Sequence, residues 1–146
     1  MHRVKGDSMK IVFSDSKTGN SFQKEIEKAK ESQLYGKTIG EKFDGGIIGL
    51  DGYTLEITGG SNREGTPMRK DVKGSRKTKA ILGGGAGVRG LHRGQKIKKT
   101  VAGNTVGENT MQLNAKIAEA GAKPLADLGF TPKPKEAKPA TEEKKK

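Results

Sequence analysis

Positive charge and glycine are concentrated in one stretch of the chain, residues 63–99. This stretch carries twelve Lys or Arg against two Asp or Glu, whereas residues 1–62 carry nine of each sign and residues 100–146 carry eight against six. A general-purpose solvated surface would not concentrate its charge in this way. A strand-like run at Lys79–Leu82 lies within the stretch and another at Ile97–Val101 closes it, so the cations and glycines indicate long basic loops on a β scaffold.

The overall charge points to a polyanionic partner. The chain of 146 residues has a formal net charge of +12, and a surplus of this size favours nucleic acid or an anionic membrane surface. No run of about 18 apolar residues is available to span a bilayer, and no helix has the bulky apolar face that interfacial binding needs. Met1–Lys10 contains no apolar signal-peptide core, and the chain has no cysteine. We therefore expect a cytoplasmic protein with no membrane partner.

Short strand-like runs separated by turn signals predict the fold. The clearest alternation is Met111–Ile117, where apolar residues occupy every second position; helix formers in Ala115–Ala120 leave a helix as the alternative, and the period of two favours a strand. Asp51-Gly52 is typical of a two-residue hairpin turn. We predict strands at Lys10–Ser14, Ser21–Ile26, Ile47–Leu50, Tyr53–Thr58, Lys79–Leu82, Ile97–Val101 and Met111–Ile117.

Little helix is expected. Helix formers over Glu27–Tyr35 predict two turns ended by Gly36, and Pro124 opens one possible turn through Leu128. We therefore predict a mainly β protein: a small β-barrel-like domain with one or two short helices and long basic loops. The domain is expected to cover residues 9–130, after an N-terminal extension at 1–8 and before a disordered Lys- and Pro-rich tail at 131–146. Translation could start at Met1 or at Met9.

Two nucleotide-binding patterns are present only in part. Gly85–Gly90 matches G-x-G-x-x-G, but Leu91–Thr100 contains Gly94 and four cations where the dinucleotide motif needs an apolar-faced helix. Gly36-Lys37-Thr38 resembles the end of a P-loop, but Glu31 stands where its first glycine must be. His2 and His92 are too distant to suggest a metal pair, and no carboxylates cluster for acid–base work. We expect no enzymatic activity, cofactor, metal or small-molecule substrate.

One segment carries a family resemblance. Ile57-Thr58-Gly59-Gly60-Ser61-Asn62-Arg63-Glu64-Gly65-Thr66-Pro67-Met68-Arg69 resembles the I-S/T-G-G-x-D-x-x-G-F-P-M signature of the eukaryotic-type small-subunit ribosomal protein six family, shared by archaea and eukaryotes. The likeness covers about residues 9–129 and includes Lys99–Thr105. Thr66 stands where the family usually has an aromatic residue, and Ala102 where Arg is expected. The tail from Thr131 has no serine and is short, which resembles the archaeal form without the long basic C-terminal helix.

The resemblance implies a β-barrel-like domain bound to small-subunit ribosomal RNA, with other ribosomal proteins as neighbours. We expect Gly59 and Gly60 to shape a turn and Pro67-Met68 to lie at the base of the basic loop. The alternatives for the basic stretch are a disordered linker or a free-standing RNA- or DNA-binding chaperone. The residues expected to contact RNA are the cations of the stretch and its histidine: Arg63, Arg69, Lys70, Lys73, Arg76, Lys77, Lys79, Arg89, His92, Arg93, Lys96, Lys98 and Lys99.

Overall fold

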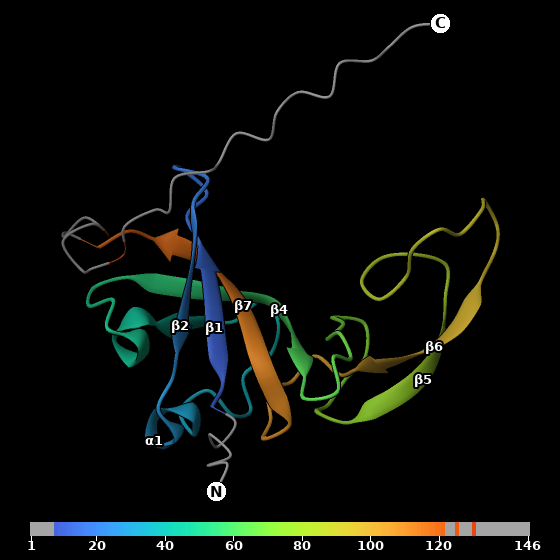
Figure 1. The fold of residues 1–146 in the computed structure, drawn as a ribbon, viewed down its shortest axis with the longest axis horizontal. Coiled ribbons are helices and arrows are strands. Elements are labelled where there is room, and N and C mark those ends of the chain that lie inside the picture. The colour runs from blue at the N-terminus through green and yellow to red at the C-terminus, as the bar shows by residue number, and fades with distance from the viewer. Residues whose placement is uncertain (1–7, 122–124, 126–129, 131–146) are drawn as a thin grey trace, which may run out of the picture.

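The computed structural model describes residues 8–121, 125 and 130, and it is mainly β (Figure 1). A five-stranded sheet has the strand order β2-β1-β7-β4-β3, and a separate two-stranded ribbon pairs β5 with β6. The elements are β1 (Lys10–Ser14), β2 (Ser21–Glu25), α1 (Lys28–Glu31), β3 (Lys42–Asp44), a 3₁₀ helix η1 (Gly45–Ile48), β4 (Thr54–Asn62), β5 (Lys77–Leu82), β6 (Ile97–Ala102) and β7 (Thr110–Glu119).

One face of the five-stranded sheet forms the core. β1 pairs antiparallel with β2 and parallel with β7, and β7 pairs antiparallel with β4. Ile11 and Phe13 lie beside Leu113 and Ala115 in the register, and all four are buried. Because side chains alternate across a strand, this register places the apolar residues on one face and leaves the polar ones on the other. The alternation read from Met111–Ile117 is therefore confirmed as a strand.

The chain between β2 and β4 covers the core face. Its apolar side chains, including Ile26, Leu34 and Leu50, pack into the same buried cluster. The buried Glu31 accepts a hydrogen bond from the backbone N–H of Met9 at 2.7 Å, which fixes the short helix against the start of β1. Burial and the neighbouring Glu31 carboxylate raise the pKa of Tyr35, whose hydroxyl donates to Glu31.

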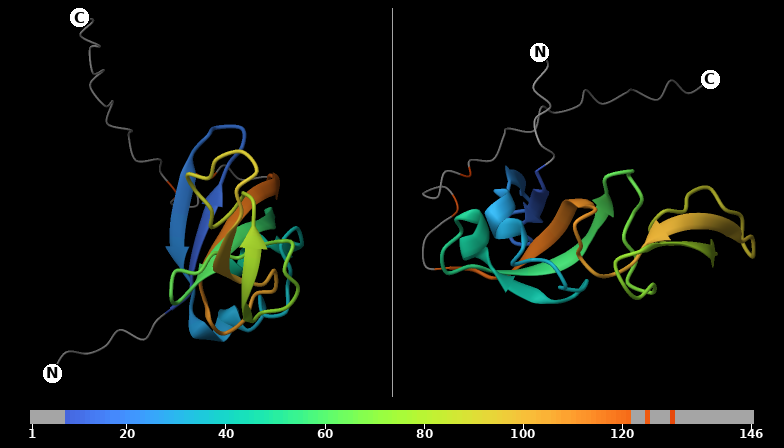
Figure 2. Two further views of the ribbon diagram at one scale, coloured as in Figure 1. Left: turned by 90° about the vertical axis from the view of Figure 1, so that its right-hand side faces the viewer. Right: turned by 90° about the horizontal axis from the view of Figure 1, so that it is seen from below.

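The ribbon of β5 and β6 extends away from this packed body. Figures 1 and 2 show it continuing beyond the end of β4, at the opposite end of the molecule from η1. The predicted strands in the basic stretch are confirmed here, with Lys77 opposite Ala102 at the base of the ribbon and Leu82 opposite Ile97 near its tip. The described part of this stretch is thus a framework of strands and turns rather than a linker.

The segment before β4 differs from the prediction. Ile47–Leu50 was expected to be a strand, but Gly45–Ile48 forms a 3₁₀ helix, whose first turn is capped by Asp44 Oδ1 accepting from the Gly46 N–H at 3.2 Å. A Cβ on Gly45 would lie 2.6 Å from the Leu50 carbonyl oxygen, so this tight fold depends on glycine there. Asp51-Gly52 therefore turns the chain from the 3₁₀ helix into β4 and does not join two paired strands.

Two further elements differ in extent. The helix expected over Glu27–Tyr35 is confined to Lys28–Glu31, because Leu34 turns into the core and tertiary packing outweighs local propensity. The three-residue strand β3 (Lys42–Asp44) was missed, since so short a run has little sequence pattern. The mainly β prediction is confirmed, but the described strands form an open sheet and a ribbon that do not close into a barrel, because β2 and β3 remain unpaired edges.

Of the expected N-terminal extension only Ser8 is described. The turn predicted from Pro124 through Leu128, apart from Leu125, and the predicted tail from residue 131 lie outside the described residues.

Candidate nucleic-acid interface

Residues Pro67–Arg69 join the sheet to the ribbon. The Met68 N–H donates to the Gly60 carbonyl of β4 at 2.9 Å. On its other side this segment pairs with Ala102 of β6, which donates to Pro67 O at 2.9 Å and accepts from the Arg69 N–H at 3.1 Å. Met68 and Ala102 are both buried in the core. The expected structural role of Pro67-Met68 is confirmed: these residues attach the ribbon to the body.

Gly59 and Gly60 of β4 lie at the same junction between the sheet and the ribbon. They were expected to form a turn, but they lie in the strand beside a register shift between Ile57 and Gly59. A Cβ on Gly60 would lie 2.4 Å from the carbonyl oxygen of Gln112 on β7. The glycine therefore permits close contact between two strands at the position where Met68 packs against β4.

The chain after β6 holds the segment 70–76. Asn104 N–H donates to Val72 O at 2.7 Å, and its side-chain oxygen accepts from the Gly74 N–H at 3.2 Å. A Cβ on Gly103 would lie only 1.8 Å from Gly74 O, so no other residue fits without a backbone shift. The run Lys99–Thr105, read as part of the basic signature, is thus also the anchor of the loop that precedes β5.

Arg69 holds the Gly-rich loop 83–88 against the base of the ribbon. Its Nη1 donates to the carbonyl oxygens of Gly84 at 3.0 Å and Ala86 at 2.8 Å, and its Nη2 lies 2.7 Å from Asp71 Oδ2. Its side chain is only 13% exposed. Arg69 was predicted to contact RNA, and the structure places its guanidinium among partners within the chain.

The glycines of the G-x-G pattern fit this arrangement. Gly85 has φ +86°, and a Cβ there would lie 3.2 Å from Arg69 Nη1. Gly87 has φ +87°, and a Cβ there would lie 3.0 Å from Pro67 Cγ. Both positions combine a left-handed backbone with close packing, which favours glycine. The pattern that resembles a dinucleotide motif is therefore used to fold the loop, and sequence reasoning missed this role of Arg69 because it counted the residue only as a charge.

The other cations predicted to bind RNA remain at the surface. Lys77 forms an ion pair with Glu64 at the base of the ribbon. Within the described part of the chain, the other cations of β5, β6 and the loop between them make no ion pair with a carboxylate. The predicted residues that are exposed are Arg63, Lys70, Lys73, Arg76, Lys77, Lys79, Arg89, His92, Arg93, Lys96, Lys98 and Lys99.

A polar hollow of about 800 Å³ lies between the two loops at the ribbon base. Its walls include the backbone of Gly85–Gly87 on one side and Gly65–Pro67 on the other, and Arg89 and Lys99 contribute to its lining. Cations beside glycine backbone suit the approach of a phosphate group. The hollow thus adds a concave element to the basic surface.

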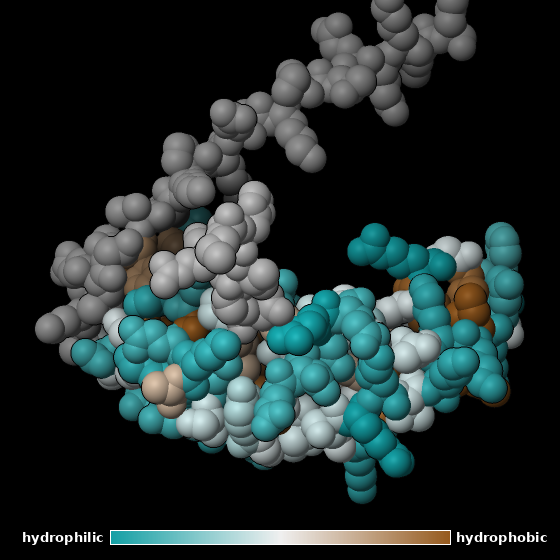
Figure 3. Space-filling view, turned by 60° about the horizontal axis from the view of Figure 1, so that its bottom comes forward, coloured by the Kyte–Doolittle hydropathy of each residue, from teal (hydrophilic) through white to brown (hydrophobic). Residues whose placement is uncertain are grey.

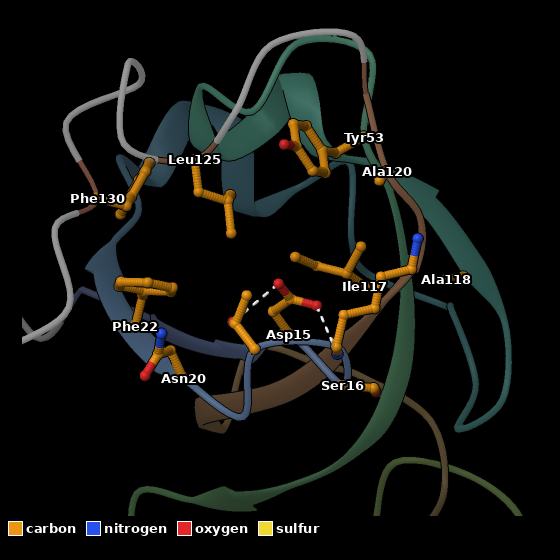
Figure 4. Close-up of a pocket in the computed structure, with 12 residues that line it drawn as sticks. Asp15, Ser16, Asn20, Phe22, Tyr53, Ile117, Ala118, Ala120, Leu125 and Phe130 are labelled. Carbon is orange, nitrogen blue, oxygen red and sulfur yellow. Dashed lines mark hydrogen bonds between the residues drawn. The ribbon is translucent and has the colours of Figure 1, made fainter.

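A second pocket, of about 570 Å³, lies at the far end of the five-stranded sheet (Figure 4). Phe22, Tyr53, Ile117 and Phe130 give it mainly apolar walls. The Asp15 carboxylate at its rim accepts hydrogen bonds from the Lys17 N–H and the Thr18 hydroxyl, both at 2.9 Å, so it serves the β1–β2 turn. This pocket has no gathering of cations and is distinct from the basic surface.

Figure 3 shows mostly hydrophilic side chains over the ribbon end of the molecule, with a small hydrophobic patch among them. In the described residues, no group of three or more His, Asp or Glu is placed to bind a metal ion. None of the described helices has the length and apolar character needed to cross a membrane. The arrangement therefore offers an extended cationic surface as its main chemical feature.

Comparison with known proteins gives one consistent result. Residues 9–129 match the family model described as ribosomal protein S6e. The chain is 42% identical over 121 residues to the small ribosomal subunit protein eS6 of Methanothermobacter thermautotrophicus, covering 83% of this chain and 94% of that protein. It is 44% identical over 119 residues to the eS6 protein of Methanocaldococcus jannaschii, covering 82% and 88%, and 41% identical over 121 residues to that of Halobacterium salinarum, covering 83% and 92%.

Proposed function

The chain belongs to the ribosomal protein S6e family, of the archaeal type, and we propose that it is a structural constituent of the small ribosomal subunit that binds ribosomal RNA through residues 63–99. Its partners are then small-subunit ribosomal RNA and neighbouring ribosomal proteins, and its place is the cytoplasmic ribosome. The family is one of structural ribosomal proteins, so the chain is not an enzyme.

The observation that carries the proposal is the state of the cations on the ribbon. Lys79, Lys98 and Lys99 are exposed on a two-stranded element and form no ion pair among the described residues. Unpaired cations on a projecting ribbon are costly for a protein alone, since they repel one another. Phosphates of a folded RNA would neutralise them.

The composition of the surface favours recognition of backbone and shape. No Phe, Tyr or Trp lies between Tyr53 and Phe130, so residues 63–99 offer no aromatic platform on which single-stranded bases could stack. Folded, largely double-helical RNA is instead bound through phosphates and ribose 2′-hydroxyls. If about six cations contact phosphates, the slope of log K against log salt should be around −4 to −5.

The experiment is sedimentation of a cell lysate through sucrose gradients at low and high salt, with detection of this chain. We expect it to migrate with the small subunit in stoichiometric amount and to remain there at moderate salt. A free-standing RNA- or DNA-binding chaperone has the same charge pattern but would stay at the top of the gradient, or smear in a way that salt abolishes. That second outcome would overturn the ribosomal assignment.

A further inference from the structure

The two faces of the β5–β6 ribbon differ in what covers them. Side chains alternate along each strand, and residues opposite each other in the register point to the same face. Leu82 and Val101 therefore share one face, and both are buried. A Cβ on Gly87 would lie 3.7 Å from Val101 Cγ1, which shows that the Gly-rich loop folds over this side, the loop-side face. The other side, the open face, displays Lys77, Lys79, Ile81, Lys98 and Thr100, and ends at the buried Ala102 where the ribbon meets the body.

Ile81 is the anomalous residue of the open face. Its side chain is 70% exposed, against 39% for Ile97 on the loop-side face and 36% for Tyr35, the other exposed large hydrophobic residues of the described chain. It lies directly opposite Lys98, with Lys79 two positions along the same strand. A strand alone does not require isoleucine here, because Thr also suits a strand and has a polar group for water.

We propose that the open face docks on a double-helical segment of ribosomal RNA, with Ile81 in contact with the sugars and base edges of the minor groove and Lys79 and Lys98 on the phosphates at either side. This inference rests on the proposed function and specifies its contact surface. The minor groove of A-form RNA is wide and shallow and displays ribose and base edges, so it admits a broad, slightly convex element. On the open face one apolar side chain lies between cations, just as the floor of the groove lies between two rows of phosphates.

Charge supports RNA over a protein as the occupant. The open face carries three lysines, and among the residues that the structure describes only Lys77, at the base, has a carboxylate partner, Glu64. Thr100, opposite Lys79, adds a hydroxyl that can bond to a ribose 2′-hydroxyl or a phosphate. A protein partner would have to supply several carboxylates around one apolar contact, whereas duplex RNA presents that pattern along its whole length.

The first test measures binding to transcribed small-subunit ribosomal RNA over a series of salt concentrations. Ile81→Thr keeps the strand propensity and the charge, and Ile97→Thr is the matched control on the loop-side face. We expect Ile81→Thr to lower the affinity about tenfold with an unchanged salt slope, because it removes apolar burial and no phosphate contact. We expect Ile97→Thr to lower it less than about threefold. Thermal unfolding of both variants checks that the ribbon remains folded.

The outcomes separate this inference from the proposed function. Wild-type binding with no salt dependence would overturn both. Steep wild-type salt dependence with an unaffected Ile81→Thr variant would overturn only the docking of the open face. An Ile81→Thr variant that binds ribosomal RNA normally but fails to enter reconstituted subunits would assign this face to a protein and so would also overturn the inference.

A second test locates the groove. The chain has no cysteine, so Ile81→Cys and Ile97→Cys each give one attachment site for a tethered iron chelate that cleaves nearby RNA. In reconstituted subunits we expect cleavage from position 81 on both strands of one helix, with the offset that marks the minor groove, and weaker cleavage from position 97. Cleavage confined to a single-stranded loop, or equal from both positions, contradicts the proposed docking.

Discussion

The polar face of the five-stranded sheet and the β5–β6 ribbon both display lysines, but they treat them differently. On the sheet, Lys116 lies opposite Glu56 in the register, and its Nζ is 3.1 Å from Glu56 Oε2. Lys10 likewise lies opposite Glu25, and its Nζ is 3.4 Å from Glu25 Oε1. On the ribbon, Lys79 lies opposite Thr100 instead.

The difference shows how one residue type serves two purposes. Paired across strands, a lysine contributes a few tenths of a kcal/mol to the sheet and leaves its surface neutral. Left unpaired, it contributes nothing to folding and keeps its charge for another molecule. The position of carboxylates, more than the number of lysines, therefore marks the candidate RNA surface.

The strongest challenge to this comparison is to neutralise three lysines in each region. The ribbon variant should lose roughly a hundredfold or more in affinity for ribosomal RNA near 0.1 M salt, and its salt slope should fall by about 2 to 3, because about three phosphate contacts are removed. The sheet variant should change affinity by less than about threefold. The ribbon variant carries Lys79→Gln, Lys98→Gln and Lys99→Gln, and the sheet variant Lys10→Gln, Lys42→Gln and Lys116→Gln.

Filter binding over a salt series measures both quantities. Equal losses from the two triple variants would mean that net charge alone governs binding and that carboxylate placement is irrelevant. Circular dichroism on each variant establishes that the strands are retained.

The two regions also differ in how their folds are stabilised. The sheet has a continuous buried core, whereas a two-stranded ribbon is marginal by itself. The ribbon instead relies on Arg69, which binds the carbonyl oxygens of Gly84 and Ala86. Arg76, the exposed residue directly before β5, has no side-chain hydrogen bond or ion pair among the described residues.

Arg69→Lys keeps the charge but loses the planar fork that reaches two carbonyls and Asp71. We expect it to cost about 1–3 kcal/mol in local stability of the loop 83–88, because two hydrogen bonds from a charged donor to loop carbonyls are removed. Hydrogen exchange of the loop amides measures this, with Arg76→Lys as the control expected to leave exchange unchanged. If Arg69→Lys lowered the affinity for ribosomal RNA without faster loop exchange, the residue would be an RNA contact rather than a positioning residue.

The sequence allowed most strands to be predicted, because their patterning is local. The alternation in β7 and the strand–turn–strand pattern of Lys10–Ile26 follow directly from residue types. The 3₁₀ helix Gly45–Ile48 could not be predicted, because its shape is set by the close contact of Gly45 with Leu50. The pattern of residue types along the sequence does not reveal this contact.

The candidate interface was predictable as a composition but not as a surface. Counting cations placed Arg69 and Lys98 in one group, although one guanidinium is enclosed by loop carbonyls and the other side chain is exposed on a strand. Ile81 and Thr100 were absent from the predicted RNA-binding set because neither is charged. Applying the period of two to β5 and β6 together would have placed both on one face with the lysines.

The smallest expected effect concerns the turn at the sheet end, which carries a carboxylate with local partners. The backbone N–H of Lys17, with further hydrogen bonds from Thr18, lowers the pKa of Asp15 below its ordinary value of 3.8. A lowered pKa in the folded state contributes stability above the unfolded pKa, and this contribution is lost as the pH falls through the folded value. Because the turn is solvent-exposed, the contribution is expected to be about 0.5 kcal/mol or less.

Asp15→Asn retains an oxygen acceptor but cannot ionise, so comparison with wild type isolates the contribution of the Asp15 charge to stability. We expect wild type to exceed this variant in free energy of unfolding at neutral pH, and the difference to vanish as the pH falls below 3.8. Urea titrations at several pH values measure it. Asp51→Asn is the matched control, since the Asp51 carboxylate accepts no hydrogen bond in the described structure. If wild type remained more stable than Asp15→Asn at low pH, the amide would be perturbing the turn itself. The charge of Asp15 would then not contribute to the stability of this turn.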